Sequence, residues 1–184
     1  MTTHAFGVIL SIGMILLIAL VFGIILTRII FGKNSTIIQK VVRYSLLIGF
    51  IVSFAGLAGS LTYSEIFGLT PCMFCWWQRI FIYPQAVLFA IAWYQSSKNT
   101  HSINIFQYTT PIAVVGSLVS LYHVLLQRGI IGLDGASSCI LSGTPCNIIS
   151  TQIFGFITIP VMALSIGITL SVLGYLVLSN KKTA

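Results

Sequence analysis

Long apolar stretches separated by short polar segments form the dominant pattern of this chain. A helix that crosses the hydrocarbon core of a membrane needs roughly 20 apolar residues. Five stretches approach or exceed this length, and we predict spans over residues 5–30, 44–61, 76–94, 111–126 and 152–178. Pro111 is expected in the first turn of the fourth span, and Pro160 is expected to kink the fifth. The predicted fold class is therefore all-α, an integral membrane protein with five spans.

The composition supports a membrane protein and changes how the charge is interpreted. Hydrophobic residues make up 57% of the 184 residues and charged residues only 6%, whereas a soluble domain is about a quarter charged. Mean hydropathy is +1.05. The formal net charge is +7, but the basic residues are scattered between apolar stretches rather than clustered. They are interpreted as flanks of membrane spans, and we expect no nucleic-acid partner.

The first stretch, residues 5–30, could be either a signal peptide or a retained span. The apolar region of a signal peptide has about 7–15 residues and follows positive charge. This stretch is longer, and no Lys or Arg precedes it. Basic residues follow it instead, namely Arg28, Lys33, Lys40 and Arg43. We predict a retained span with the N-terminus outside.

The distribution of Lys and Arg tests this orientation. The predicted inner segments hold Arg28, Lys33, Lys40, Arg43, Lys98, Lys181 and Lys182, and the outer ones hold Arg79 and Arg128. Seven against two is the asymmetry that the positive-inside rule requires. The same orientation puts all four cysteines on the extracytoplasmic face, where disulfides persist.

Cys72 and Cys75 form a C-x-x-C motif directly after Pro71, where a helix is expected to begin. A disulfide between them would close a very small loop and would constrain the unfolded chain little, so redox chemistry is the favoured interpretation. A helix N-terminus carries partial positive charge, which favours the reactive thiolate. Arg79 lies four residues after Cys75, on the same helical face, and adds a cation.

Arg79 and His123 are candidate binding residues within the spans. A charged residue in a span indicates a functional site unless its head group reaches the interface by snorkelling. Next to a redox dithiol, we favour an anion or a quinone carbonyl as the ligand of Arg79. His123 either forms a hydrogen bond between helices or is a hydrogen-bond partner for a quinone at the same depth.

Cys139 and Cys146 form a second pair, in the loop of residues 128–151. Four cysteines allow three disulfide connectivities, and this pair alone could be a structural staple. Four thiolates could also bind zinc. The oxidising compartment and the long apolar separation between the two pairs argue against a zinc site.

The segment from Cys72 to Arg79, followed by Tyr83-Pro84, resembles the DsbB family of membrane thiol oxidases and, within it, the shorter BdbC-like branch. Other segments that fit this branch are residues 59–61, 63–65, 122–127, 144–146 and 154–160. The resemblance covers about residues 41–178, most of the chain.

The resemblance implies a four-helix membrane bundle over residues 41–184. It implies an enzyme of the bacterial cytoplasmic membrane that oxidises an extracytoplasmic thioredoxin-fold, DsbA-like partner and passes the electrons to a membrane quinone, ubiquinone or menaquinone. Residues 1–40, an additional N-terminal transmembrane helix and a basic inner loop, depart from the family pattern.

Roles for individual residues follow from the same resemblance. Cys139 and Cys146 would form the loop disulfide, which the partner attacks at Cys139. Cys72 and Cys75 would re-oxidise that pair, with the sulfur of Cys75 facing the quinone. Two further residues would line the quinone site, Arg79 and His123.

Two other functions stay open from the sequence. A membrane conduit could carry reducing equivalents outward, although no cysteine lies in the predicted inner loops or in the middle of a span. A non-enzymatic membrane protein with structural disulfides is the other. Accessibility of the thiols from each face and resistance to mild reductant distinguish these from an oxidase.

Overall fold

The structure is a computed structural model that describes residues 3–32, 35–97, 105–131, 146 and 152–181. Helices dominate the described residues. In chain order the elements are α1 (Thr3–Phe31), α2 (Thr36–Arg43), α3 (Ser45–Leu61), the π-helical turn η1 (Thr62–Ile66), α4 (Met73–Ser97), α5 (Phe106–Gln127), β1 (Gln152–Ile153), β2 (Ile157–Thr158) and α6 (Ile159–Lys181). The predicted all-α class is confirmed.

The helices support a membrane protein but not every predicted span. Among the described residues, four helices are long and apolar enough to cross a membrane, namely α1, α3 with η1, α5 and α6. The third predicted span corresponds to α4, which has 25 residues but does not reach that apolarity. Its polar and helix-breaking residues explain why, and they include Gln78, Arg79, Tyr83, Pro84 and Gln85.

Three predicted boundaries are wrong. The second predicted span ends at residue 61, but residues 62–66 continue α3 as a π-helical turn. Helix α5 begins at Phe106, so Pro111 lies inside it rather than in its first turn. The fifth span was expected from Gln152, yet α6 begins only at Ile159, after a β-hairpin. Pro160 is therefore in the first turn of α6, where proline is tolerated, and not at a central kink.

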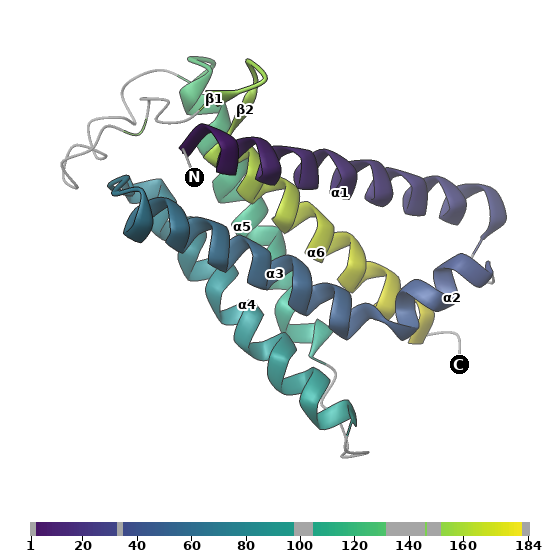
Figure 1. The fold of residues 1–184 in the computed structure, drawn as a ribbon. Coiled ribbons are helices and arrows are strands. Elements are labelled where there is room, and N and C mark those ends of the chain that lie inside the picture. Colours follow the sequence, from purple (N-terminus) through teal and green to yellow (C-terminus); the bar gives the residue numbers. More distant parts are fainter. Residues whose placement is uncertain (1–2, 33–34, 98–104, 132–145, 147–151, 182–184) are drawn as a thin grey trace.

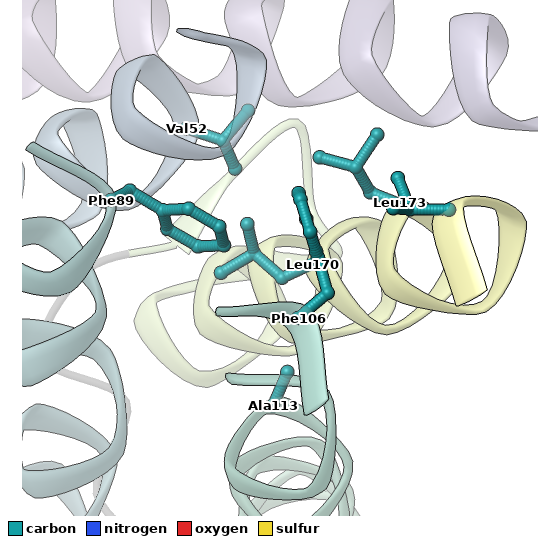
Figure 2. Close-up of a cluster of buried hydrophobic side chains, with 7 residues drawn as sticks. Val52, Phe89, Phe106, Ala113, Leu170 and Leu173 are labelled. Atoms are coloured by element: carbon teal, nitrogen blue, oxygen red, sulfur yellow. The ribbon is translucent and has the colours of Figure 1, made fainter. Parts of the chain in front are cut away.

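Helices α3 to α6 form the bundle, and α1 lies along its side against α6 (Figure 1). The N-terminal end of α1 and the hairpin lie at one end of the molecule, with α2 and the C-terminal end of α6 at the other (Figure 1). Each bundle helix contributes to one apolar core (Figure 2), which contains Val52, Phe89, Phe106, Ala113, Leu170, Leu173 and Val177.

Small residues allow the bundle helices to approach one another closely. A Cβ atom added at Gly49 of α3 would lie 2.8 Å from the ring of Phe89 in α4. Gly167 and Gly174 of α6 lie in the same way against Ser117 and Thr110 of α5. Apolar helices gain little from burying apolar surface away from lipid, so close packing of this kind is what holds them together.

Helix α1 is attached to the bundle in its N-terminal half and near its C-terminal end. Met14 packs with Ile153 and Ile157 of the hairpin, whose strands pair antiparallel. Near the other end, the Arg28 guanidinium donates a hydrogen bond to Ser179 Oγ of α6 at 3.1 Å. The added N-terminal helix is therefore part of the same packed unit.

Candidate functional site

The C-x-x-C motif lies at the N-terminus of α4, as predicted. The Cys72 carbonyl accepts a helical hydrogen bond from the Trp76 amide at 3.1 Å, so Cys72 immediately precedes the first turn and Cys75 lies within it. Both are free thiols, with their sulfurs 2.9 Å apart. The Cys75 amide also donates to Cys72 Sγ at 3.4 Å. A thiolate on Cys72 therefore receives hydrogen bonds from the thiol and the amide of Cys75.

His123 of α5 connects the two cysteine segments. It is 1% exposed, and its Nε2 lies 3.8 Å from Cys72 Sγ and 3.2 Å from the Cys146 carbonyl oxygen. Its Nδ1 lies 3.3 Å from the side-chain nitrogen of Gln78. Since an amide nitrogen can only donate, Nδ1 accepts this bond. The proton of neutral His123 then resides on Nε2, facing Cys146 and Cys72.

Cys146 lies beside the first pair. It is disulfide-bonded and buried, and it packs with Cys72 and Leu126. Cys139, the other cysteine of the predicted second pair, lies outside the described residues. The fold thus brings one cysteine of the distant loop to the mouth of α4, which sequence spacing alone does not predict.

The surroundings of Cys72 favour its ionised form. The hydrogen bond from the Cys75 thiol is the largest cause, and His123 adds a second hydrogen bond and favourable electrostatics. Burial acts in the opposite direction, but the net effect lowers the pKa of Cys72 to about 4. The reduced motif therefore carries a thiolate on Cys72 at neutral pH, the form that attacks a disulfide.

Arg79 is held by the neighbouring helix rather than being free at the interface. Its Nε donates to Ser60 Oγ at 3.0 Å and its Nη2 to the Ser60 carbonyl at 3.3 Å. The guanidinium carbon also lies 5.2 Å from the centre of the Trp76 ring, a cation–π contact. In the part of the chain that the structure describes, Arg79 forms no ion pair. Its charge is thus positioned without being neutralised.

A cavity of about 410 Å³ lies between α1, α3, α4 and α6. Most of its wall is apolar. Its polar contributions come from Ser60, Tyr63, Cys75, Gln78, Arg79, Tyr83 and Ser165. The hydroxyls of Tyr63 and Tyr83 are buried without a hydrogen-bond partner among the described residues. Buried hydroxyls without a partner are uncommon in folded proteins.

The predicted site residues fall into two adjoining groups. Cys72, His123 and Cys146 form one, and Arg79 borders the cavity. Cys75 belongs to both, since it contacts Cys72 and lines the cavity. His123 is not among the residues that line the cavity, so its role there stays a prediction.

Sequence reasoning missed several residues of this region. From the sequence, Ser60 is only a small residue suited to close helix packing, yet it holds the Arg79 side chain. Gln78, which orients His123, and the cavity hydroxyl of Tyr63 were not assigned either. A polar side chain one turn from a C-x-x-C motif was the available signal for Gln78. Nothing in the sequence pairs Ser60 with Arg79.

The same cluster has a donor set that suits a metal ion. One ligand atom from each of Cys72, Cys75 and His123 lies within 4.8 Å of the others. Two thiolates and an imidazole are zinc ligands, although a closed structural site takes four. The zinc site weighed from the sequence used four thiolates, and one of those, Cys139, lies outside the described residues.

Comparisons with known proteins agree with this geometry. Residues 42–177 match the family model described as disulfide bond formation protein DsbB. The chain is 36% identical over 143 residues to the probable disulfide formation protein C of Bacillus cereus, covering 78% of this chain and 98% of that protein. It is 38% identical over 114 residues to disulfide bond formation protein C of Bacillus subtilis, covering 62% and 78%. No solved structure matches significantly.

The resemblance found in the motifs is therefore confirmed over most of the chain. The matched region contains both cysteine pairs, Arg79 and His123. It begins after α1. The chain belongs to the DsbB family of disulfide bond formation proteins.

Proposed function

We propose that this protein is a membrane thiol oxidase that re-oxidises an extracytoplasmic thioredoxin-fold dithiol partner and passes the electrons to a membrane quinone. The observation that carries the proposal is the double position of Cys75. Its sulfur lies 2.9 Å from Cys72 Sγ, and the residue also lines the cavity beside Arg79. One residue thus contacts both the thiol cluster and a space for an electron acceptor.

The proposed sequence of exchanges balances electrons and protons. The reduced partner transfers two electrons to the disulfide of Cys139 and Cys146 and leaves as a disulfide. The resulting dithiol then reduces the disulfide of Cys72 and Cys75. Oxidation of that second dithiol releases two electrons and two protons, which convert a quinone to a quinol. Each exchange proceeds by attack of a thiolate on a disulfide sulfur.

The contacts of Cys72 support its role in exchange with the loop pair. It packs beside Cys146 and accepts hydrogen bonds that stabilise its thiolate. His123 Nε2 faces both Cys72 and the Cys146 carbonyl. From there its proton can stabilise the thiolate that leaves when the disulfide exchanges.

The cavity has the chemistry that a quinone requires. A quinone supplies a two-electron oxidising ring with two carbonyl oxygens that accept hydrogen bonds. The mostly apolar wall suits the ring and its tail, and the Arg79 guanidinium offers N–H donors to an oxygen. Tyr63 and Tyr83, whose buried hydroxyls have no hydrogen-bond partner among the described residues, belong to the same wall. Arg79 is held in place by Ser60, so charge that develops on an oxygen meets a preorganised cation.

The orientation of the helices supports five spans with the cysteines outside. The N-terminal end of α1, the cysteine motif at the start of α4 and the hairpin share one end of the molecule (Figure 1). We propose that α4 also spans the membrane, covered by the other helices on part of its surface. The distribution of basic residues then places the cysteine end on the extracytoplasmic face of a bacterial cytoplasmic membrane.

Quinol formation by the purified protein tests the proposal. With a reduced thioredoxin-fold oxidase as donor, ubiquinone or menaquinone should be reduced with one disulfide formed per quinol. Cys75→Ser should abolish turnover. Absence of quinone-dependent turnover in the unsubstituted protein, or full turnover in Cys75→Ser, would contradict the proposal. A protein purified with stoichiometric zinc and inert to the partner would favour the metal site instead.

Thiol labelling from each membrane face separates an oxidase from an outward conduit. In the reduced protein, labelling of the cysteine thiols only from the extracytoplasmic side is expected for the oxidase. Labelling from the cytoplasmic side would support the conduit. Serine substitutions that lower abundance while leaving the redox state of the partner unchanged would support purely structural disulfides.

A further inference from the structure

Helix α1 forms one wall of the cavity although it lies outside the region that matches the family. The match begins at residue 42, whereas α1 ends at Phe31. Five α1 residues line the cavity, namely Ile9, Leu10, Gly13, Met14 and Leu17. Their spacing places them on one face of the helix. The cavity beside Cys75 and Arg79 is therefore composite, with most of its wall from the family bundle and one side from this helix.

The wall is held in a defined position. Met14 is 6% exposed and packs into the hairpin cluster, which anchors the middle of the cavity-facing stretch. Leu10 contacts α3, because a Cβ atom added at Gly59 would meet its side chain at 3.3 Å. This face of α1 thus has a set distance from α3 and does not lie loosely over the opening.

Helix α1 also determines the surroundings of a cavity hydroxyl. The Phe6 ring packs edge-on against Tyr63 with centroids 5.4 Å apart. A Cβ atom added at Gly7 would lie 3.0 Å from Tyr63 Oη. Tyr63 is 4% exposed, and its hydroxyl has no partner among the described residues. The backbone of α1 therefore covers the buried hydroxyl of a residue that lines the cavity.

We propose that α1 is a specificity-determining wall of the quinone site, whose residues set the quinone ring substituents and the part of the isoprenoid tail that the cavity accepts. This inference rests on the proposed quinone oxidase function. A quinone is the occupant because the cavity brings together Cys75 of the C-x-x-C motif, the Arg79 cation and an apolar wall. A lipid acyl chain would use only the apolar wall.

Gly13 offers a direct way to change this wall. It lines the cavity, and a Cβ atom added there meets nothing within 4 Å. A larger side chain can therefore occupy the space without colliding with another helix. Gly23 is the matched control, because it lies on the same helix, has equally open space at its Cβ position and does not line the cavity. Alanine and leucine both favour helix over glycine, so neither substitution weakens α1 itself.

The experiment compares the full-length protein with Gly13→Ala, Gly13→Leu and Gly23→Leu. Steady-state quinol formation gives KM for quinones of different tail length. Gly13→Leu is expected to raise KM by about fivefold or more for the long-tailed quinone, with Gly13→Ala between it and the unsubstituted protein. Gly23→Leu should leave KM unchanged. The single-turnover rate at which the partner dithiol reduces the protein should be the same in all four proteins.

The outcomes separate this inference from the function on which it rests. If the unsubstituted protein reduces quinone but both Gly13 variants keep its KM, α1 is not a wall of the site. An equal rise in Gly23→Leu would also overturn the inference, because the effect would then be general to the helix. If Gly13→Leu does not fold, the KM of Gly13→Ala decides. No quinone reduction by the unsubstituted protein would contradict the proposed function itself.

Discussion

His123 Nε2 lies 3.8 Å from Cys72 Sγ. The same nitrogen lies 3.2 Å from the Cys146 carbonyl oxygen, so one ring atom faces both cysteine segments. Gln78 holds the opposite side of the ring at 3.3 Å and thereby orients it. A buried histidine oriented in this way can stabilise a thiolate and also fix the loop to the bundle. These two consequences can be measured separately.

The first prediction concerns the acidity of Cys72. Its lowered pKa, about 4, means that the thiolate persists as the pH falls and is lost only as the pH passes below that value. In the reduced protein, alkylation of Cys72 should change little between about pH 6 and pH 8. In Cys75→Ala the main hydrogen-bond donor is gone, so the pKa should rise toward about 8.5 and alkylation at about pH 6 should slow.

Mass spectrometry of the peptide that contains Cys72 measures this directly. It separates Cys72 from the thiols of Cys139 and Cys146. Equal pH profiles in the reduced protein and in Cys75→Ala would contradict the assigned cause of the shift.

The second prediction concerns the stability that His123 provides. His123→Ala removes the hydrogen bonds that His123 forms with the Gln78 amide and the Cys146 carbonyl, and the loss of a hydrogen bond to a group that stays buried costs about 1–3 kcal/mol. The midpoint of thermal unfolding in detergent should fall accordingly. Ser120→Ala is the control, because Ser120 is as buried but donates only within its own helix, to the Gly116 carbonyl. A larger loss in the control than in His123→Ala would refute a linking role.

The third prediction concerns the two hydrogen bonds from Arg79 to Ser60. Lysine keeps the charge but cannot reproduce this fork, so Arg79→Lys should raise KM for quinone by about tenfold and leave thiol exchange unchanged. Arg128→Lys is the matched control, since Arg128 donates to the Phe156 carbonyl and does not line the cavity. Quinol formation gives KM, and single-turnover reduction gives the exchange rate. An unchanged KM in Arg79→Lys would remove Arg79 from the site.

The fourth prediction concerns packing between α3 and α4. The ring of Phe89 would be 2.8 Å from a Cβ atom at Gly49, so Gly49→Ala should destabilise the bundle by about 1–3 kcal/mol. Unfolding in detergent measures the loss. Combining it with Phe89→Leu should recover part of it, because residues in contact are energetically coupled. Purely additive losses in the double variant would show that the two do not compete for space.

The sequence by itself determined the class of the protein and the place of its C-x-x-C motif. The apolar stretches are long enough to span a membrane. Because lipid admits only helices and closed barrels, such stretches predict helices. The C-x-x-C motif and Arg79 lie within one helix, so their relation depends on local spacing alone. Their place at the N-terminus of α4 was predictable for the same reason.

Only the tertiary structure decided which distant residues share the site. Cys146 packs with Cys72, and His123 contacts both cysteine segments. Ser60 holds Arg79, and α1 forms one wall of the cavity. Each contact joins segments far apart in the chain, and helix patterns do not encode which apolar faces meet when nearly every face is apolar. The short hairpin before α6 was missed for a related reason, since its strands continue an apolar stretch without a change of pattern. Close packing at small residues selects which helices pack together. That selection places Cys75 between Cys72 and the cavity.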